Sequence, residues 1–233
     1  MNRHERRAAK AQAKSAKLDR VVAVHEAGHA VGRILSAGDM GLNPTDAIAY
    51  IDIAPDTGPM TSFDKSVTLK SQATTFGPMI SREIQAVWDR RHADISKDQW
   101  NLSAMPEVIK QAKDEGADIG KWLRAKMLMT VLGSMAEAKL TGKHFQEVWD
   151  SYECEQDVKD AVRDGVMAGL ETPEISAAID AAMLTASELI AQPNVWKAIT
   201  ALADRLPSHG RMLGPQASAI VLKELGPDFS VHN

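Results

Sequence analysis

The chain has 233 residues, of which 44% are hydrophobic and 25% are charged, a composition typical of a globular protein with room for one large domain. Its net charge of −4 argues against general nucleic-acid binding, and its single cysteine, Cys154, excludes an intrachain disulfide and fits a reducing cytoplasm. No apolar run approaches the ~18–20 residues that span a bilayer, and no secretory signal is recognisable. We therefore expect a cytoplasmic protein that is not attached to a membrane.

The N-terminal segment is rich in basic side chains and in alanine. Its basic residues, which outnumber Glu5 and Asp19, are Arg3, Arg6, Arg7, Lys10, Lys14, Lys17 and Arg20. We interpret residues 1–17 as a basic helical arm, either a solvated extension of the next helix or a docking arm for an acidic partner or nucleic acid. The absence of aromatic residues within the arm argues against the nucleic-acid version.

The next helix carries the sequence His25-Glu26-Ala27-Gly28-His29. Residues four apart lie on nearly the same helix face, so the spacing places two imidazoles side by side, able to share one Zn²⁺. Glu26 then stands where its carboxylate can take a proton from a water that the metal activates. Apolar and small residues recur at helical spacing on the same face, so we predict that both histidines lie on a buried stripe. The alternative is a pair of surface histidines.

The segments that follow predict a small β element and then helices. Residues 47–53 alternate and are β-branched, which predicts a strand, and residues 60–63 predict a second short strand after a turn. From residue 75 onward the pattern becomes helical. We expect helices over residues 79–93, from 103 onward, and over 116–140, 153–170, 173–192, 195–206 and 215–225.

A catalytic zinc usually has three protein ligands, so a third must lie farther along the chain. His92, His144, His209 and His232 stand in polar sequence contexts. The segment Glu153–Asp157 is richer, because two carboxylates four residues apart could serve as ligand and supporting partner in either order. Cys154 could also bind the metal as a thiolate. The alternative is an ordinary acidic first turn of a helix.

Residues 24–31, Val-His-Glu-Ala-Gly-His-Ala-Val, resemble the zinc helix of the FtsH-type ATP-dependent metalloproteases. In the same order, residues 48–63 resemble the family's strand–turn–strand, residues 132–142 its Leu-Gly-Gly-x-x-Ala-Glu-Glu helix, and residues 153–162 the helix whose aspartate is the third ligand. The resemblance covers residues 18–225, apart from a diverged or inserted stretch at about 66–118. It implies a mainly α, zincin-like peptidase domain over residues 18–233, with a small β element beside the H-E-x-x-H helix. The implied zinc ligands are His25, His29 and Asp157.

The resemblance also implies a function. Glu26 would be the general base of a zinc-dependent endopeptidase that cleaves unfolded or extended polypeptides. Substrate would add to an edge strand near Tyr50, Ile51 and Ile53, or near Met60. Glu137 in the motif helix would orient a histidine, cap a neighbouring element or form a structural salt bridge, and Glu153 would support the site.

The chain departs from the family pattern at three points. Ser134 stands at the second motif glycine, and Glu153-Cys154 replaces a glycine–alanine pair. No G-x-x-x-x-G-K-[ST] phosphate-binding loop occurs, so we expect a free-standing peptidase domain whose basic arm docks to a separate ATPase or another partner. Two alternatives stay open, namely a catalytically silent adaptor with the same fold and a zinc hydrolase of a non-peptide substrate.

Overall fold

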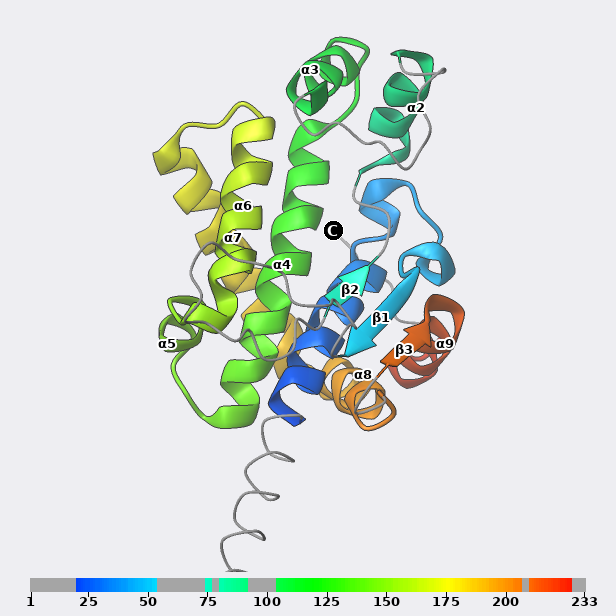
Figure 1. Cartoon of the computed structure of the whole chain (residues 1–233), viewed down its shortest axis with the longest axis vertical. Coiled ribbons are helices and arrows are strands. Elements are labelled where there is room, and N and C mark those ends of the chain that lie inside the picture. Colours follow the sequence, from blue (N-terminus) through cyan, green and yellow to red (C-terminus); the bar gives the residue numbers. More distant parts are fainter. Residues whose placement is uncertain (1–19, 54–73, 77–79, 92–103, 207–209, 228–233) are drawn as a thin grey trace, which may run out of the picture.

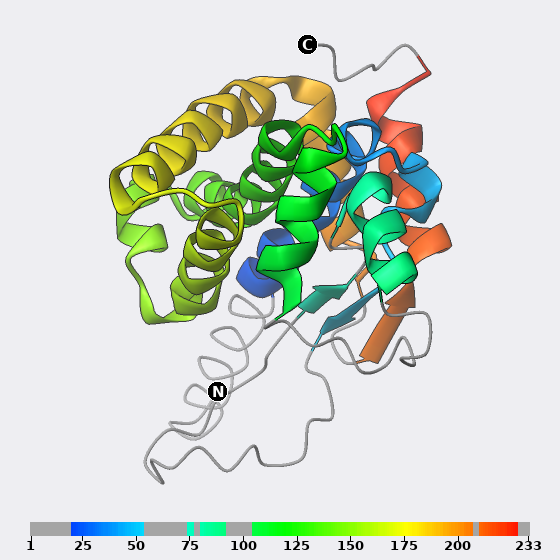
Figure 2. The ribbon, with the colours of Figure 1, turned by 90° about the horizontal axis from the view of Figure 1, so that it is seen from above.

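A computed structural model describes residues 20–53, 74–76, 80–91, 104–206 and 210–227. The arm over residues 1–17 and the predicted strand at 60–63, with Met60, lie outside the described residues. Figure 1 shows the long helix α4 (Ile119–Thr141) along the middle of the molecule, with α5–α7 on one side and the β-strands with α8 and α9 on the other. The view from above in Figure 2 shows the same division.

The helix that carries His25 and His29 covers residues 20–35 of the described chain and is called the motif helix here. It lies beside α4 in the interior, and Val24, Ala27 and Val31 are fully buried. Each residue from 20 to 35 is buried or half-buried, so the motif helix is enclosed on nearly every side. His25 and His29 are half-buried, with side chains 14% exposed, so the prediction that they lie on the buried stripe holds only in part.

The α4 helix is delimited by its own sequence. The Asp118 carboxylate accepts a hydrogen bond from the Lys121 backbone N–H at 2.8 Å, and Gly142 ends the helix in a left-handed conformation (φ 72°). Two short turns, η1 (Gly38–Met40) and η2 (Pro44–Asp46), link the motif helix to the sheet. The helices, together with the small sheet described next, confirm the prediction of a mainly α fold with a small β element.

The sheet has three short antiparallel strands in the order β2 (Thr74–Phe76), β1 (Tyr50–Ile53), β3 (Gly210–Leu213). Ile51 stands opposite Thr75 on one side and Met212 on the other. The strand at 50–53 is confirmed, but its expected role as an edge strand is wrong, because β1 is paired on both sides. The helical pattern expected from residue 75 is also wrong at its start, and β3 was not predicted.

The remaining helices form around α4 near the predicted positions. They are α2 (Arg82–Arg91), α3 (Met105–Asp114), α5 (Phe145–Trp149), the turn η4 (Tyr152–Cys154), α6 (Glu155–Met167), α7 (Thr172–Ala191), α8 (Pro193–Ala203) and α9 (Gly214–Leu225). Proline occupies the first turn of α3, α7, α8 and α9, where a backbone N–H would have no hydrogen-bond partner within the helix. Of these, only the five-residue α5 and the turn η4 were not predicted.

The stretch at 66–118, expected to be diverged or inserted, is described in part. Its helices α2 and α3 pack on each other, and their buried residues, including Ile84, Trp88 and Val108, belong to the same hydrophobic core as the motif helix. Across the described ranges, none of the helices combines the length and the apolar character needed to cross a bilayer.

Candidate metal centre

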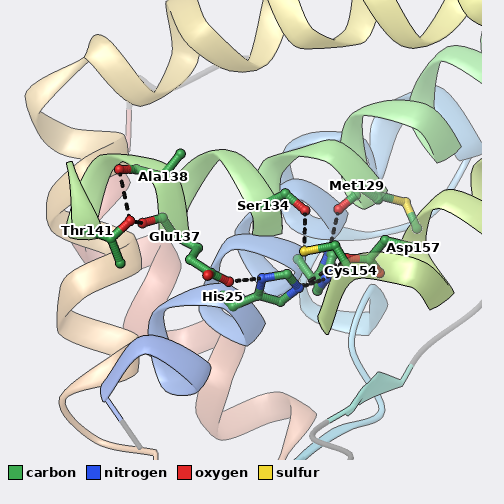
Figure 3. A network of polar contacts seen from close by, with 9 residues as sticks. His25, Met129, Ser134, Glu137, Ala138, Thr141, Cys154 and Asp157 are labelled. Carbon is green, nitrogen blue, oxygen red and sulfur yellow. Dashed lines mark hydrogen bonds and ion pairs between the residues drawn. The ribbon is translucent and has the colours of Figure 1, made fainter. Parts of the chain in front are cut away.

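Three potential ligand atoms converge between the motif helix and the first turns of α6. His25 Nε2 lies 3.1 Å from Asp157 Oδ2, His29 Nε2 lies 3.4 Å from the same oxygen, and the two Nε2 atoms are 2.9 Å apart. Figure 3 shows His25 and Asp157 pointing toward each other from the two helices. The ligands of a tetrahedral zinc with bonds of about 2.0–2.1 Å are separated by about 3.3 Å, so this triangle fits a zinc ion with small adjustments.

The outer nitrogen of each imidazole faces a hydrogen-bond acceptor. His25 Nδ1 donates to Oε2 of Glu137 at 3.1 Å, and His29 Nδ1 donates to the backbone carbonyl of Met129 at 2.8 Å. Both acceptors come from α4, the neighbour of the motif helix (Figure 3). A proton held on Nδ1 leaves the Nε2 lone pair aimed at the centre, which is the tautomer that a metal ligand requires. Of the three roles predicted for Glu137, the contact with His25 fits two, namely orienting a histidine and, when His25 is protonated, forming a salt bridge.

The electrostatics of the centre favour a proton or a metal ion among the three ligand atoms. Burial would lower the pKa of His25, but hydrogen bonds with Asp157 and Glu137 outweigh it and raise that pKa well above the ordinary value. Burial would raise the pKa of Asp157, yet the charge of His29 and the bonds from both imidazoles hold it far below its usual range. Two nitrogens and a carboxylate oxygen this close repel one another unless a proton or a metal ion lies among them.

Glu26 lies on the motif helix next to the first ligand and is 6% exposed. Its negative charge helps to raise the pKa of both His25 and His29, so its carboxylate lies within electrostatic reach of the centre. A buried carboxylate beside a three-ligand metal site is the arrangement that general-base catalysis needs.

Two glycines allow the motif helix and α4 to approach closely. A Cβ on Gly133 of α4 would lie 2.5–2.7 Å from the ring nitrogens of His29, closer than atoms can pack. A Cβ on Gly28 would lie 2.6 Å from the carbonyl oxygen of Leu132. The imidazole of His29 therefore rests directly on the α4 backbone, which also places it against the Met129 carbonyl.

Cys154 does not belong to the triangle of ligand atoms. It ends the turn η4 immediately before α6, is fully buried, and its sulfur accepts a hydrogen bond from the Ser134 hydroxyl at 3.3 Å (Figure 3). Ser134 and Cys154 are both positions at which the sequence departs from the FtsH-type pattern, and they contact each other. Spacing alone left Cys154 open as the third ligand, and the described geometry favours Asp157.

The other predicted residues stand apart from the centre or outside the description. His144 is exposed and caps α5 by accepting a hydrogen bond from the Gln146 backbone N–H. His92, His209 and His232 lie outside the described residues, and the side chain of Glu153 is not described. Among the edge candidates, Tyr50 and Ile51 belong to the central strand, and Ile53 ends it opposite Gly210.

A buried ion pair farther along the same helices was not predicted. Lys126 of α4 lies 3.1 Å from Asp164 of α6, and both side chains are at most 5% exposed. Asp164 follows Asp157 by seven residues, two helical turns, so it lies on the same face of α6 as the third ligand. That heptad spacing is the one signal in the sequence that could have pointed to it. The pair fastens the ligand-bearing helix to α4.

Comparisons of the chain with protein-family models, with curated proteins and with solved structures found no match. The functional argument therefore rests on the residues of this chain.

Proposed function

We propose that this chain is a zinc-dependent metalloendopeptidase of the FtsH-peptidase type. The observation that carries the proposal is the convergence of His25, His29 and Asp157 while Glu137 and the Met129 carbonyl hold both outer imidazole nitrogens. A structural zinc site needs four closed ligands and no base, whereas the described residues bring three candidate ligands and a buried glutamate to this centre. The order of the matching motifs along the chain also supports the family assignment.

Zinc in this centre would supply a Lewis acid and an activated water for attack on a peptide carbonyl. Glu26 would accept the proton during attack and return it to the leaving amine, because its buried carboxylate stands next to His25 in the chain and within electrostatic reach of both histidines. Glu137 and the Met129 carbonyl keep both imidazoles in the metal-binding tautomer.

The substrate is an extended polypeptide. Since β1 is central, the edge that we propose for substrate is the outer side of β2, which has no further strand partner among the described residues. Figures 1 and 2 place β2 on the side of the sheet that faces α4, whereas β3 lies toward α9. An added strand on β2 would therefore run along the side of the sheet nearest the metal centre.

The test is digestion by the full chain loaded with one equivalent of Zn²⁺. We expect slow cleavage of unfolded casein, no cleavage of a stable folded domain and no effect of ATP, because the chain has no phosphate-binding loop and folded proteins rarely expose extended backbone. The control is the Glu26→Gln protein, loaded in the same way. A zinc-loaded chain that cleaves neither casein nor short peptides would refute the peptidase proposal, and a folded chain that binds no zinc would refute the site.

A further inference from the structure

A second group of potential metal ligands shares His25 with the first. It consists of His25, Glu137 and Cys154, which come from the motif helix, α4 and η4 respectively. One ligand atom from each lies within 4.8 Å of the others. His25 is common to this group and to the proposed zinc site, and its Nε2 lies against Asp157 whereas its Nδ1 lies against Glu137.

The donor set of this second group is softer than that of the first. It offers an imidazole nitrogen, a carboxylate oxygen and a sulfur, whereas the first offers two nitrogens and an oxygen. A cysteine thiolate favours thiophilic ions such as Cd²⁺, and a bound metal removes the thiol proton. Ser134 and Glu137 lie on α4 about one turn apart. The Ser134 hydroxyl contacts the Cys154 sulfur, and the Glu137 carboxylate contacts His25.

We propose that His25 Nδ1, the Glu137 carboxylate and the Cys154 thiolate form a second metal site, specific for soft divalent cations. Binding replaces the Nδ1 proton and the thiol proton by bonds to the metal, so two protons are released to solvent and no electron is transferred. The Nδ1–H···Glu137 hydrogen bond is lost in the process. With zinc on Nε2, the ring of His25 then bridges the two ions as an imidazolate.

The occupied second site has a consequence for catalysis, and this consequence rests on the proposed function. Glu137 would bind the second ion instead of orienting His25, and outer partners of this kind change metal affinity by about 10–100-fold. Excess Cd²⁺ is therefore expected to inhibit the zinc-loaded peptidase.

The experiment is a titration of the zinc-loaded full chain with Cd²⁺, monitored by the ultraviolet thiolate-to-cadmium charge-transfer absorption. Because Cys154 is the sole cysteine in the sequence, any such band reports this residue, and cadmium that replaces zinc in the first site gives none. We expect a band that saturates at one cadmium per chain. Absence of the band in the folded protein would overturn the proposal.

Matched variants separate the two sites. His29→Ala removes a ligand of the first group alone and should leave the cadmium band within about threefold of the wild-type affinity, whereas Glu137→Ala should weaken it by about ten-fold or more. His25→Ala should weaken both sites. A band unaffected by Glu137→Ala and His25→Ala would show that Cys154 binds cadmium alone, which also overturns the proposal. A band retained in a chain without peptidase activity would support the second site and refute the proposed function.

Discussion

Gly133 offers a sharp test of how the centre is built, because its neighbour in space is a ligand rather than ordinary core. Replacing it by alanine puts a methyl group 2.5–2.7 Å from the His29 ring nitrogens, so the imidazole must move off α4. Helix propensity favours alanine by about 1 kcal/mol. Overpacking costs about 1–3 kcal/mol, and loss of the hydrogen bond to the Met129 carbonyl costs about 1 kcal/mol more.

The net expectation for Gly133→Ala is a loss of about 1–3 kcal/mol in the free energy of unfolding, together with a fall in zinc affinity of about ten-fold or more. Gly120→Ala in the same helix is the matched control. Its added methyl group would lie 3.3 Å from the Asp118 oxygen that caps α4 and 3.5 Å from the end of the Arg124 side chain, so we expect a change of at most about 1 kcal/mol in either direction.

The assays are urea unfolding of the metal-free proteins and zinc binding in competition with a chromogenic chelator. The comparison between the two alanine variants removes the common effect of helix propensity. If Gly133→Ala were as stable as Gly120→Ala and bound zinc as tightly as the wild type, the close contact between His29 and α4 would be refuted.

Three further predictions concern the ligands and the base. Glu26→Gln should keep zinc while casein turnover falls by about 10²–10⁴-fold, and undiminished turnover would exclude Glu26 as the base. Asp157→Ala should lower zinc affinity by about ten-fold or more, whereas Cys154→Ser should change it little. If Cys154→Ser lost zinc while Asp157→Ala kept it, Cys154 and not Asp157 would be the third ligand. The third concerns pH in the metal-free protein. Because the pKa of His25 is raised above its unfolded value of about 6.5, its stabilisation is complete below that pH and is lost as pH rises through the raised pKa. Urea unfolding should therefore show that the stability of the metal-free protein falls above a pH of about 6.5. Zinc binding, measured separately, should become tighter over the same pH range. Both trends should be weaker in Asp157→Asn, which lacks the partner charge.

The local sequence was sufficient for features whose determinants lie close together along the chain. The spacing of His25 and His29 is of this kind and predicted the candidate ligand pair, and the apolar pattern of residues 116–140 predicted α4 to within three residues at each end. The third ligand required a resemblance, because spacing could not separate Asp157 from Glu153 and Cys154. The structure then places Asp157 with the histidines and Cys154 with Ser134.

Features that depend on distant pairing were not predictable from local patterns. Strand β1 becomes central because Tyr50 pairs with Phe76 and with Leu213, which is far away along the chain. Strand β1 was predicted because it ends a longer alternating run over residues 47–53, whereas β2 and β3 have no such run around them and were missed. The role of the Met129 carbonyl has no side-chain signature, and Lys126 and Asp164 look like surface residues until two helices bring them together.

Asp157, the proposed third ligand, is carried by a less enclosed helix than the two histidines. The motif helix lies in the core, whereas α6 buries chiefly Ala161, Asp164 and Gly165 and leaves Val162 and Val166 exposed. Elements with fewer buried contacts open at lower free energy than core elements, so backbone amides of α6 should exchange with deuterium before those of the motif helix. A bound metal would then escape through transient opening of α6, with its release rate set by that motion and by the Lys126–Asp164 pair that opposes it. The histidine pair would remain preformed throughout, ready to recapture an ion.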